Sequence, residues 1–198
     1  MSLRRSYTLI APLYDALLST AGTSLRAESL SQLPHQDGLN ILISGIGTGL
    51  DLPYLPQNHH YTGLDLTAAM LKRVKPRVGG LHMNLIQGNS MALPFANESF
   101  NHAVLHLILA IVPDAHACLR ETARVLKPGG SVLILDKFLK PGETAWLRRG
   151  LNLVSRHIVT RLDVVFEEVL ASVPELRLER DAPLLAGGWF RSIRLIKE

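Results

Sequence analysis

Cysteine is nearly absent from this chain of 198 residues, which contains only Cys118. A single thiol excludes a framework of internal disulfides and a metal site built from several cysteines. The eight histidines show no zinc-binding spacing either, so we expect no metal site. Cys118 is interpreted as a small buried residue of a helix, and His59 and His60 as residues of a solvated turn. A reducing, cytoplasmic environment is the expected location.

Long apolar runs are missing as well. The longest one, AVLHLILAIV at 103–112, is interrupted by His106, whereas a helix that spans a membrane needs roughly 20 apolar residues. The first residues lack the apolar core and the small-residue cleavage site of a signal peptide, so neither element is expected. No linker or repeat divides the sequence, and residues 1–198 are predicted to form one domain with one core.

A strand that leads into a glycine-rich turn is the most informative feature that is present. Residues 40–56 read NILISGIGTGLDLPYLP and contain alternate glycines at Gly45, Gly47 and Gly49. Because glycine has no side chain, the backbone N–H groups of such a turn are predicted to be free to bind a polar ligand. Asp65 ends a second predicted strand about 20 residues beyond the first glycine, where a carboxylate can bind the hydroxyls of a ribose.

Short apolar segments alternate with helical segments along the chain. Strands are predicted near 40–44, 60–64, 83–87, 102–107 and 131–136, and helices near 66–75 and 114–126. This alternation predicts an α/β fold, a doubly wound parallel sheet with helices on both faces. Ligands of such sheets bind at the carboxyl ends of the strands, which is where the glycine turn and Asp65 are predicted to lie.

Four segments give the chain a resemblance to a known superfamily. They are ILISGIGTG (41–49), YTGLDLTAAMLKRV (61–74), IQGNSMALPFANESFNHAVLHLILAIVPD (86–114) and LKPGGSVLILDKF (126–138). In this order and spacing they resemble the class I S-adenosylmethionine-dependent methyltransferases. The resemblance implies S-adenosyl-L-methionine as the cofactor. It also implies a Rossmann-like, mostly parallel sheet of seven strands, in which 177–179 and 190–196 form an antiparallel C-terminal hairpin.

The segments 7–18 and 166–197 look more like one branch of that superfamily, the bacterial phospholipid N-methyltransferases that methylate phosphatidylethanolamine. The superfamily resemblance also implies the roles of the site residues: the glycines approach the methionine part of the cofactor, Asp65 holds the ribose and Leu66 packs on the adenine. The expected cofactor-binding residues are Gly45, Gly47, Gly49, Asp51, Asp65, Leu66, Asn89, Ser90, Met91 and His106.

Two positions depart from the superfamily pattern. Ile43 stands where an acidic residue usually helps to orient the methionine ammonium, and Asn89 stands where an acidic residue often accepts a hydrogen bond from the adenine amino group. The carbonyl oxygen of Asn89 can still accept, although the bond is not charge-assisted. For the ammonium, either Asp51 takes over part of the work or the cofactor binds weakly.

Methyl transfer needs little acid–base chemistry, because the sulfonium is already a good leaving group. An amine acceptor must nevertheless lose a proton before it can attack. His106, at the end of the fourth predicted strand, is the candidate base; the alternative is a hydrogen-bonded core histidine. Tyr14 is the second catalytic candidate, because its ring can close the pocket and face a substrate cation; the alternative is an ordinary helix anchor.

Positive charge gathers in one segment. The chain has 21 Lys and Arg against 17 Asp and Glu, and residues 140–161 contain five basic side chains and one acid, which equals the net charge of +4. Together with its apolar residues, the segment 139–165 is predicted to be a basic amphipathic helical insertion that contacts an anionic membrane. Residues 1–30 are predicted to form a helical cap over the site. The alternative is that both segments only cover the sheet or the site.

Three functions remain open. The first is methyl transfer from S-adenosylmethionine to the amine of a phospholipid such as phosphatidylethanolamine, by a cytoplasmic enzyme that is peripheral at the inner membrane surface. The second is methylation of another small molecule, such as a quinone precursor, a thiol or a natural-product hydroxyl. The third is a degenerate cofactor-binding domain without turnover. Nucleic acid is not an expected partner, since base flipping usually needs an added recognition domain.

Overall fold

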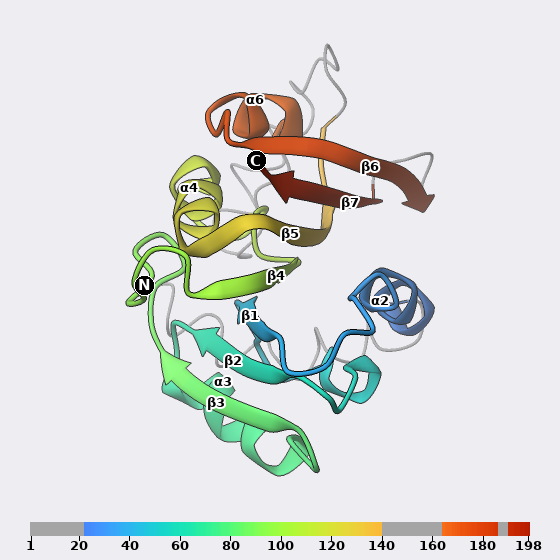
Figure 1. The fold of residues 1–198 in the computed structure, drawn as a ribbon, viewed down its shortest axis with the longest axis vertical. Coiled ribbons are helices and arrows are strands. Elements are labelled where there is room, and N and C mark those ends of the chain that lie inside the picture. Colours follow the sequence, from blue (N-terminus) through green and yellow to red (C-terminus); the bar gives the residue numbers. More distant parts are fainter. Residues whose placement is uncertain (1–21, 140–163, 186–189) are drawn as a thin grey trace, which may run out of the picture.

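The structure is a computed structural model, and it describes residues 22–139, 164–185 and 190–198. Seven strands form one sheet in the order β3-β2-β1-β4-β5-β7-β6, with β3 and β6 at its two edges (Figure 1). The strands are β1 (Asn40–Ser44), β2 (His60–Asp65), β3 (His82–Gln87), β4 (Phe100–His106), β5 (Leu126–Lys137), β6 (Leu176–Leu185) and β7 (Phe190–Lys197).

The sheet is doubly wound and mostly parallel, as predicted. Strands β1 to β5 pair with one another in parallel, and β7 is antiparallel to both β5 and β6. The reversal of strand order between β1 and β4 puts the ends of both strands at the crevice where such folds bind ligands. The predicted antiparallel C-terminal hairpin is therefore confirmed, although β6 is longer than the expected segment because it pairs with β7 along almost its whole length.

Strand β5 begins at Leu126 rather than near residue 131. Leu126 pairs with Phe100, and the register then shifts so that Ser131 pairs with His102. The bulge between them contains Gly129, with φ of +76°, and Gly130, where a Cβ atom would lie 2.5 Å from the carbonyl oxygen of Asn101. Glycine is required at both positions, so the LKPGG motif joins the helix to the strand without a separate loop.

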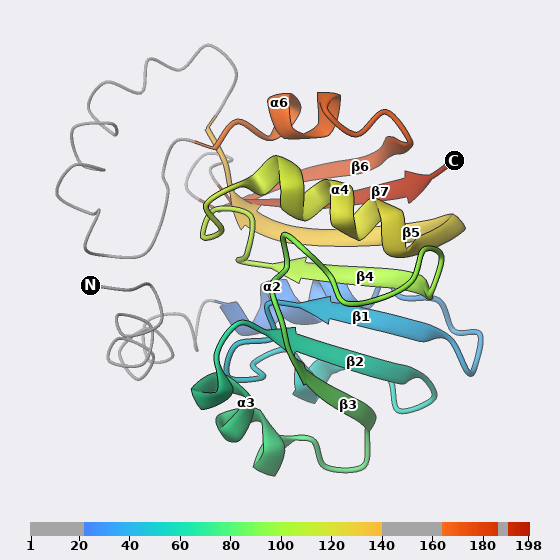
Figure 2. The same cartoon turned by 90° about the vertical axis from the view of Figure 1, so that its left-hand side faces the viewer.

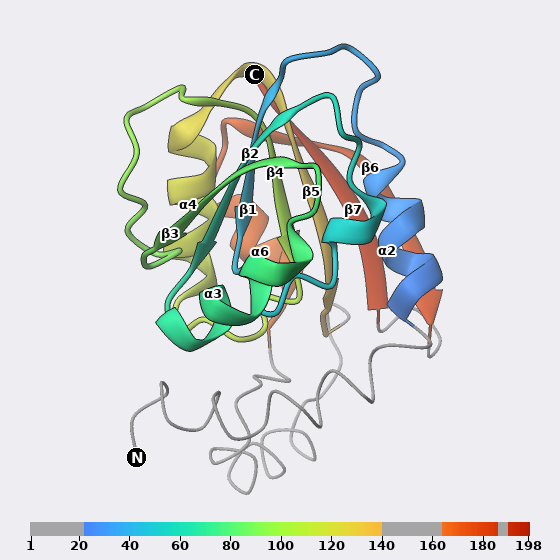
Figure 3. The same cartoon turned by 90° about the horizontal axis from the view of Figure 1, so that it is seen from below.

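Helices cover both faces of the sheet (Figures 2 and 3). They are α2 (Gly22–Leu30), α3 (Ala68–Val74), α4 (Ala115–Val125) and α6 (Phe166–Ala171), with the short 3-10 helices η1 (Leu52–Tyr54) and η2 (Lys75–Arg77). One apolar cluster joins one face to α4 and α6, through residues such as Leu119 and Phe166. A second cluster joins the other face to Leu30 of α2, Leu52 of η1 and Val74 of α3. The described residues are organised around these two clusters.

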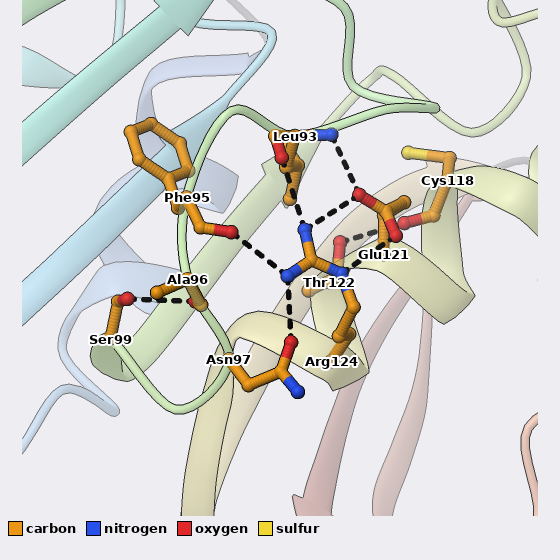
Figure 4. A network of polar contacts seen from close by, with 9 residues as sticks. All are labelled: Leu93, Phe95, Ala96, Asn97, Ser99, Cys118, Glu121, Thr122 and Arg124. Carbon is orange, nitrogen blue, oxygen red and sulfur yellow. Dashed lines mark hydrogen bonds and ion pairs between the residues drawn. The ribbon is translucent and has the colours of Figure 1, made fainter.

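Helix α4 fixes the long loop between β3 and β4. The Arg124 guanidinium binds Glu121 at 2.8 Å and donates to the carbonyl oxygens of Leu93 and Phe95, while Glu121 accepts the N–H of Leu93 at 2.7 Å (Figure 4). Charge-assisted bonds of this kind hold irregular backbone firmly. The loop between β3 and β4, which contains the expected adenine contact Asn89, is thereby attached to α4.

The prediction for Cys118 is confirmed, whereas the prediction for His59 is wrong. Cys118 is fully buried in α4, as expected, and burial raises the pKa of its thiol to about 12. His59 is not in a solvated turn: its side chain is fully buried, and Nε2 lies 3.1 Å from the carbonyl oxygen of Pro34. The interpretation was wrong because the loop after α2 covers this residue, whereas His60, at the start of β2, is exposed.

Of the predicted cap at 1–30, the structure describes only the part from residue 22, which forms α2. Most of the predicted insertion at 139–165, as well as Tyr14, lies outside the described residues. No helix in the described part of the chain has the length and apolar character needed to cross a membrane.

Candidate active site

The glycine turn after β1 has the backbone conformation that its sequence suggests. Gly45, Gly47 and Gly49 have φ angles of +75°, +57° and +81°, a region that residues with side chains rarely adopt. At Gly45 there is also no room, because a Cβ atom would lie 2.6 Å from Cδ1 of Ile108. The turn therefore requires glycine for both its conformation and its close contact with the loop after β4.

The N–H groups of these glycines are already bonded within the protein. Those of Gly45 and Ile46 donate to the carbonyl oxygen of Leu64 at 2.8 and 2.9 Å, and that of Gly49 donates to Ile46 at 3.0 Å. The N–H of Gly47 donates to Asp65 at 3.0 Å. The prediction of free donors is wrong for the three glycines, because the turn folds back against the end of β2.

Asp65 is fixed at the end of β2 by donors from the glycine turn and from Thr67, the residue that caps α3. One carboxylate oxygen accepts from Gly47, and the other accepts from the backbone N–H and the hydroxyl of Thr67 at 2.9 and 3.1 Å. Burial raises the pKa of Asp65, while these donors lower it and so reduce the shift. The oriented oxygens keep lone pairs for further donors such as ribose hydroxyls. Next to it, the Leu66 side chain is 41% exposed, a suitable surface for a flat ring.

The residues after β3 use part of their bonding capacity on the loop itself. Oδ1 of Asn89 accepts the N–H of Met91 at 2.9 Å, and the hydroxyl of Ser90 accepts that of Ser44 at 2.8 Å. Asn89 keeps one lone pair on Oδ1 and its amide donors for the edge of a base. Ile43, on β1, is 1% exposed and belongs to the apolar cluster on the α2 face.

A buried polar chain lies beside the glycine turn and joins α2 to the ends of β1 and β4. Nη1 of Arg26 donates to Oδ1 of Asp51 at 2.6 Å, and Nδ1 of His106 lies 2.9 Å from the same oxygen. Nε2 of His106 lies 3.0 Å from the hydroxyl of Ser29. Burial alone would raise the pKa of Asp51, but its electrostatic interactions and hydrogen bonds with His106 and Arg26 lower it well below its usual value. Asp51 is therefore an ionised, buried carboxylate.

His106 has both ring nitrogens engaged, and its side chain is 1% exposed. Because an ionised carboxylate can only accept, Nδ1 carries the proton that is shared with Asp51, and a neutral ring then keeps its lone pair at Nε2. This is the bonding expected of the core-histidine alternative, and it is also the orientation that a general base requires. The catalytic role of His106 thus stays a prediction, with Ser29 as its immediate neighbour.

Sequence reasoning missed three polar residues of this region. Arg26 and Ser29 are three positions apart on α2, but nothing in a short helical segment indicates distant partners. Asp136, fully buried at the end of β5, accepts the N–H of Ala110 at 3.1 Å, and burial raises its pKa to about 6. It anchors the loop after β4, in which Leu107 has a φ of +56°. An acid at the end of a predicted strand was a signal that could have identified Asp136.

Comparisons with known proteins agree with this geometry. A family profile described as "Methyltransferase domain" matches residues 42–134. The chain is 29% identical to a phosphatidylethanolamine N-methyltransferase of Cereibacter sphaeroides, over 96% of this chain and 95% of the relative. It is 34% identical to a demethylmenaquinone methyltransferase of Listeria welshimeri, over 76% of this chain and 67% of the relative.

A solved structure of an S-adenosylmethionine-dependent methyltransferase from Thermotoga maritima has the same fold. It is 18% identical, has a TM-score of 0.73, and matches 99% of this chain and 100% of that one. The domain profile and the relatives therefore agree on an enzyme that uses S-adenosylmethionine, and the solved structure shows the same fold. The chain belongs to the class I S-adenosylmethionine-dependent methyltransferases.

Proposed function

We propose that the enzyme methylates the amine of a phospholipid such as phosphatidylethanolamine at an anionic membrane surface. The main support is the extent of the match to the phosphatidylethanolamine N-methyltransferase, which covers nearly the full length of both chains. The match therefore includes the segments on either side of the common methyltransferase core, at 1–41 and 135–198. These outer segments are where acceptor specificity is expected to lie, because the core serves the methyl donor in every branch.

A cationic surface at the β3 edge supports the membrane part of the proposal. Residues 66–97 contain no Asp or Glu, while Lys72, Arg73, Lys75 and Arg77 gather on α3 and η2. None of the four forms an ion pair with another described residue, and Lys72, Lys75 and Arg77 are exposed. Each basic residue near an anionic surface contributes on the order of 1 kcal/mol to binding. Arg77 also donates to the carbonyl oxygen of Thr48 at 2.8 Å, so this surface adjoins the glycine turn.

The chemistry requires a donor site, an aligned acceptor and a route for one proton. S-adenosylmethionine supplies a methyl group on a sulfonium centre. Asp65 is oriented to hold the ribose, and Leu66 offers its exposed side chain to the adenine. Asp51 holds His106 with its Nε2 lone pair directed at the hydroxyl of Ser29. We assign to His106, held by Asp51, the role of accepting the amine proton, either directly or through Ser29.

A quinone precursor is the second candidate acceptor. The demethylmenaquinone methyltransferase has the higher sequence identity, 34%, although over a smaller share of both chains. Methylation at a quinol carbon also benefits from a base that removes a proton from a ring hydroxyl. Both acceptors are membrane lipids, so the cationic surface does not distinguish them.

A parallel comparison of the two acceptors tests the proposal. The purified chain would be incubated with labelled S-adenosylmethionine and vesicles of phosphatidylethanolamine mixed with an anionic lipid. Parallel vesicles would contain demethylmenaquinol, with phosphatidylcholine in place of phosphatidylethanolamine. Label in monomethylated phosphatidylethanolamine is the expected result, identified by mass spectrometry. Label only in the quinol would overturn the proposal in favour of the second acceptor, and label in neither would exclude both.

A further inference from the structure

We propose that Arg26 and Asp51 form the binding site for the charged amino-acid end of S-adenosylmethionine, with Arg26 pairing with the α-carboxylate and Asp51 with the α-ammonium. The inference rests on the identity of the methyl donor and does not depend on the acceptor. It assigns a cofactor role to Arg26 of α2, a residue outside the common methyltransferase core.

The glycine turn lacks the usual partner for an ammonium group. Ile43 occupies the position of the acid on β1, and its side chain packs in an apolar cluster with Ile41 and Ile46. Asp65, the carboxylate at the end of β2, is oriented by Gly47 and Thr67 toward the ribose side. Asp51 directly follows the turn and is 4% exposed, so it supplies a buried negative charge close to the missing acid.

Asp51 does not stand alone, because Arg26 lies against it. Their charged atoms are 2.6 Å apart, and the two side chains are 8% and 6% exposed. An isolated buried carboxylate would be costly, whereas a buried pair carries no net charge. The amino-acid end of the ligand is a zwitterion with the same two charges. When this end binds beside Arg26 and Asp51, each charged group has a neighbour of opposite charge. The ligand then brings no net charge into the buried site.

The chemistry of each partner suits the assignment. A guanidinium presents planar, parallel donors that match a carboxylate, and it stays protonated at every relevant pH. Asp51 remains ionised because its pKa is lowered, so it can accept from an ammonium. Arg26 and Asp51 therefore provide one donor group and one acceptor group, side by side, next to the glycine turn.

Helix α2 and His106 hold this pair in position. Arg26 and Ser29 are on the same face of α2, and Ser29 contacts His106, which in turn contacts Asp51. Rotation of Asp51 away from Arg26 would break the bond to His106 and leave buried groups without partners. The pair is thus pre-organised before any ligand binds, which lowers the entropic cost of binding.

Binding measurements with three ligands test the assignment on the full chain. The ligands are S-adenosylhomocysteine, its analogue without the α-carboxylate, and 5′-methylthioadenosine, which lacks the whole amino-acid end. In calorimetric titrations, the wild-type chain should bind the analogue about 10- to 100-fold more weakly than S-adenosylhomocysteine, the loss expected for bonds to a charged group. Arg26→Gln should abolish that preference, while its affinity for 5′-methylthioadenosine should change less than about threefold.

Arg180→Gln is the matched control, because it removes an exposed arginine of β6 that pairs with Glu28 of α2, the helix that also carries Arg26. It should leave all three affinities unchanged. If Arg26→Gln weakens S-adenosylhomocysteine and 5′-methylthioadenosine equally, Arg26 acts only by holding the fold and the assignment fails. Should Arg26→Gln not fold, the wild-type preference between the first two ligands decides. Equal affinity of the wild-type chain for S-adenosylhomocysteine and for its analogue without the α-carboxylate would overturn the proposal. Failure of phospholipid methylation would not affect it.

Discussion

The two edges of the sheet carry positive charge in opposite ways. At the β6–β7 edge every arginine of the two strands contacts a carboxylate: the pairs are Arg177–Glu198, Arg180–Glu28, Arg191–Asp181 and Arg194–Glu179. At the β3 edge the basic residues of α3 and η2 have no ion-pair partner within the described residues, and the sequence from 66 to 97 contains no acid.

This difference means that similar counts of basic residues serve different purposes. At the β6–β7 edge, acids on the same hairpin and on α2 and α6 cancel the field, and the pairs contribute to stability where they are buried. At the β3 edge the charges add, and they attract anionic partners over about one Debye length, roughly 8 to 10 Å at ordinary salt. The charge of residues 140–161 equals the net charge of the chain, but the β3 edge is a second place where positive charge gathers.

The largest expected effect tests the stabilising role of the paired edge. Arg191 is 5.8 and 5.2 Å from the ring centroids of Phe138 and Phe166, and it contacts Asp181 and Glu167. Arg191→Met should lower the free energy of unfolding by about 3 kcal/mol, because the two carboxylates lose their shared partner and the two rings lose a cation. Chemical denaturation measures this change.

Arg177→Met is the control for that experiment. Arg177 is 57% exposed and pairs with Glu198, which is 64% exposed, so its loss should change the free energy of unfolding by less than about 0.5 kcal/mol. Equal effects of the two variants would show that burial does not distinguish the pairs of this edge.

The second prediction tests the field of the unpaired edge. Lys72→Gln combined with Lys75→Gln should weaken binding to anionic vesicles about 30-fold at low salt, since each cation contributes on the order of 1 kcal/mol. Arg177→Gln with Arg180→Gln removes the same net charge from the opposite edge and should have a much smaller effect. Cosedimentation measures both. If both variants lose equal affinity, net charge rather than its position controls binding.

A third prediction concerns the two acids that border the acid-free segment, Asp65 and Glu98. Asp65→Asn should weaken binding of S-adenosylhomocysteine about tenfold, because hydrogen bonds from the ribose to a charged acceptor become bonds to a neutral one. Glu98→Gln, at the other boundary of the same segment, should leave the affinity unchanged. Calorimetry that finds no loss for Asp65→Asn would remove the ribose assignment.

The smallest effect is expected from pH. Burial raises the pKa of Asp136, on β5 next to the paired edge, to about 6, so between the ordinary pKa of an aspartate and pH 6 the folded state binds more protons than the unfolded state. Stability contributed by this group is therefore lost as pH rises, by about 1 kcal/mol between pH 5 and pH 7. Asp136→Asn should remove this slope in unfolding experiments, and an unchanged slope would contradict the assignment.

Much of the fold followed from local patterns. Apolar segments of strand length, separated by helical segments, indicate a doubly wound sheet whatever the side chains later contact. Bounds were less predictable at β5, since the register shift at Gly129 and Gly130 depends on pairing with β4. His59 was misassigned for a similar reason: its burial depends on a loop that precedes it by about 25 residues.

For the site, the sequence by itself determined the groups that act through backbone geometry. The alternate glycines permit the left-handed conformation that the turn needs, and Asp65 is the last residue of its strand. Only the tertiary structure decided which N–H groups remain free, that Asp51 meets Arg26 and His106, and which arginines find carboxylates. The physical reason is that a hydrogen bond or ion pair depends on distance and burial, and residues far apart in a sequence acquire both only when the sheet assembles.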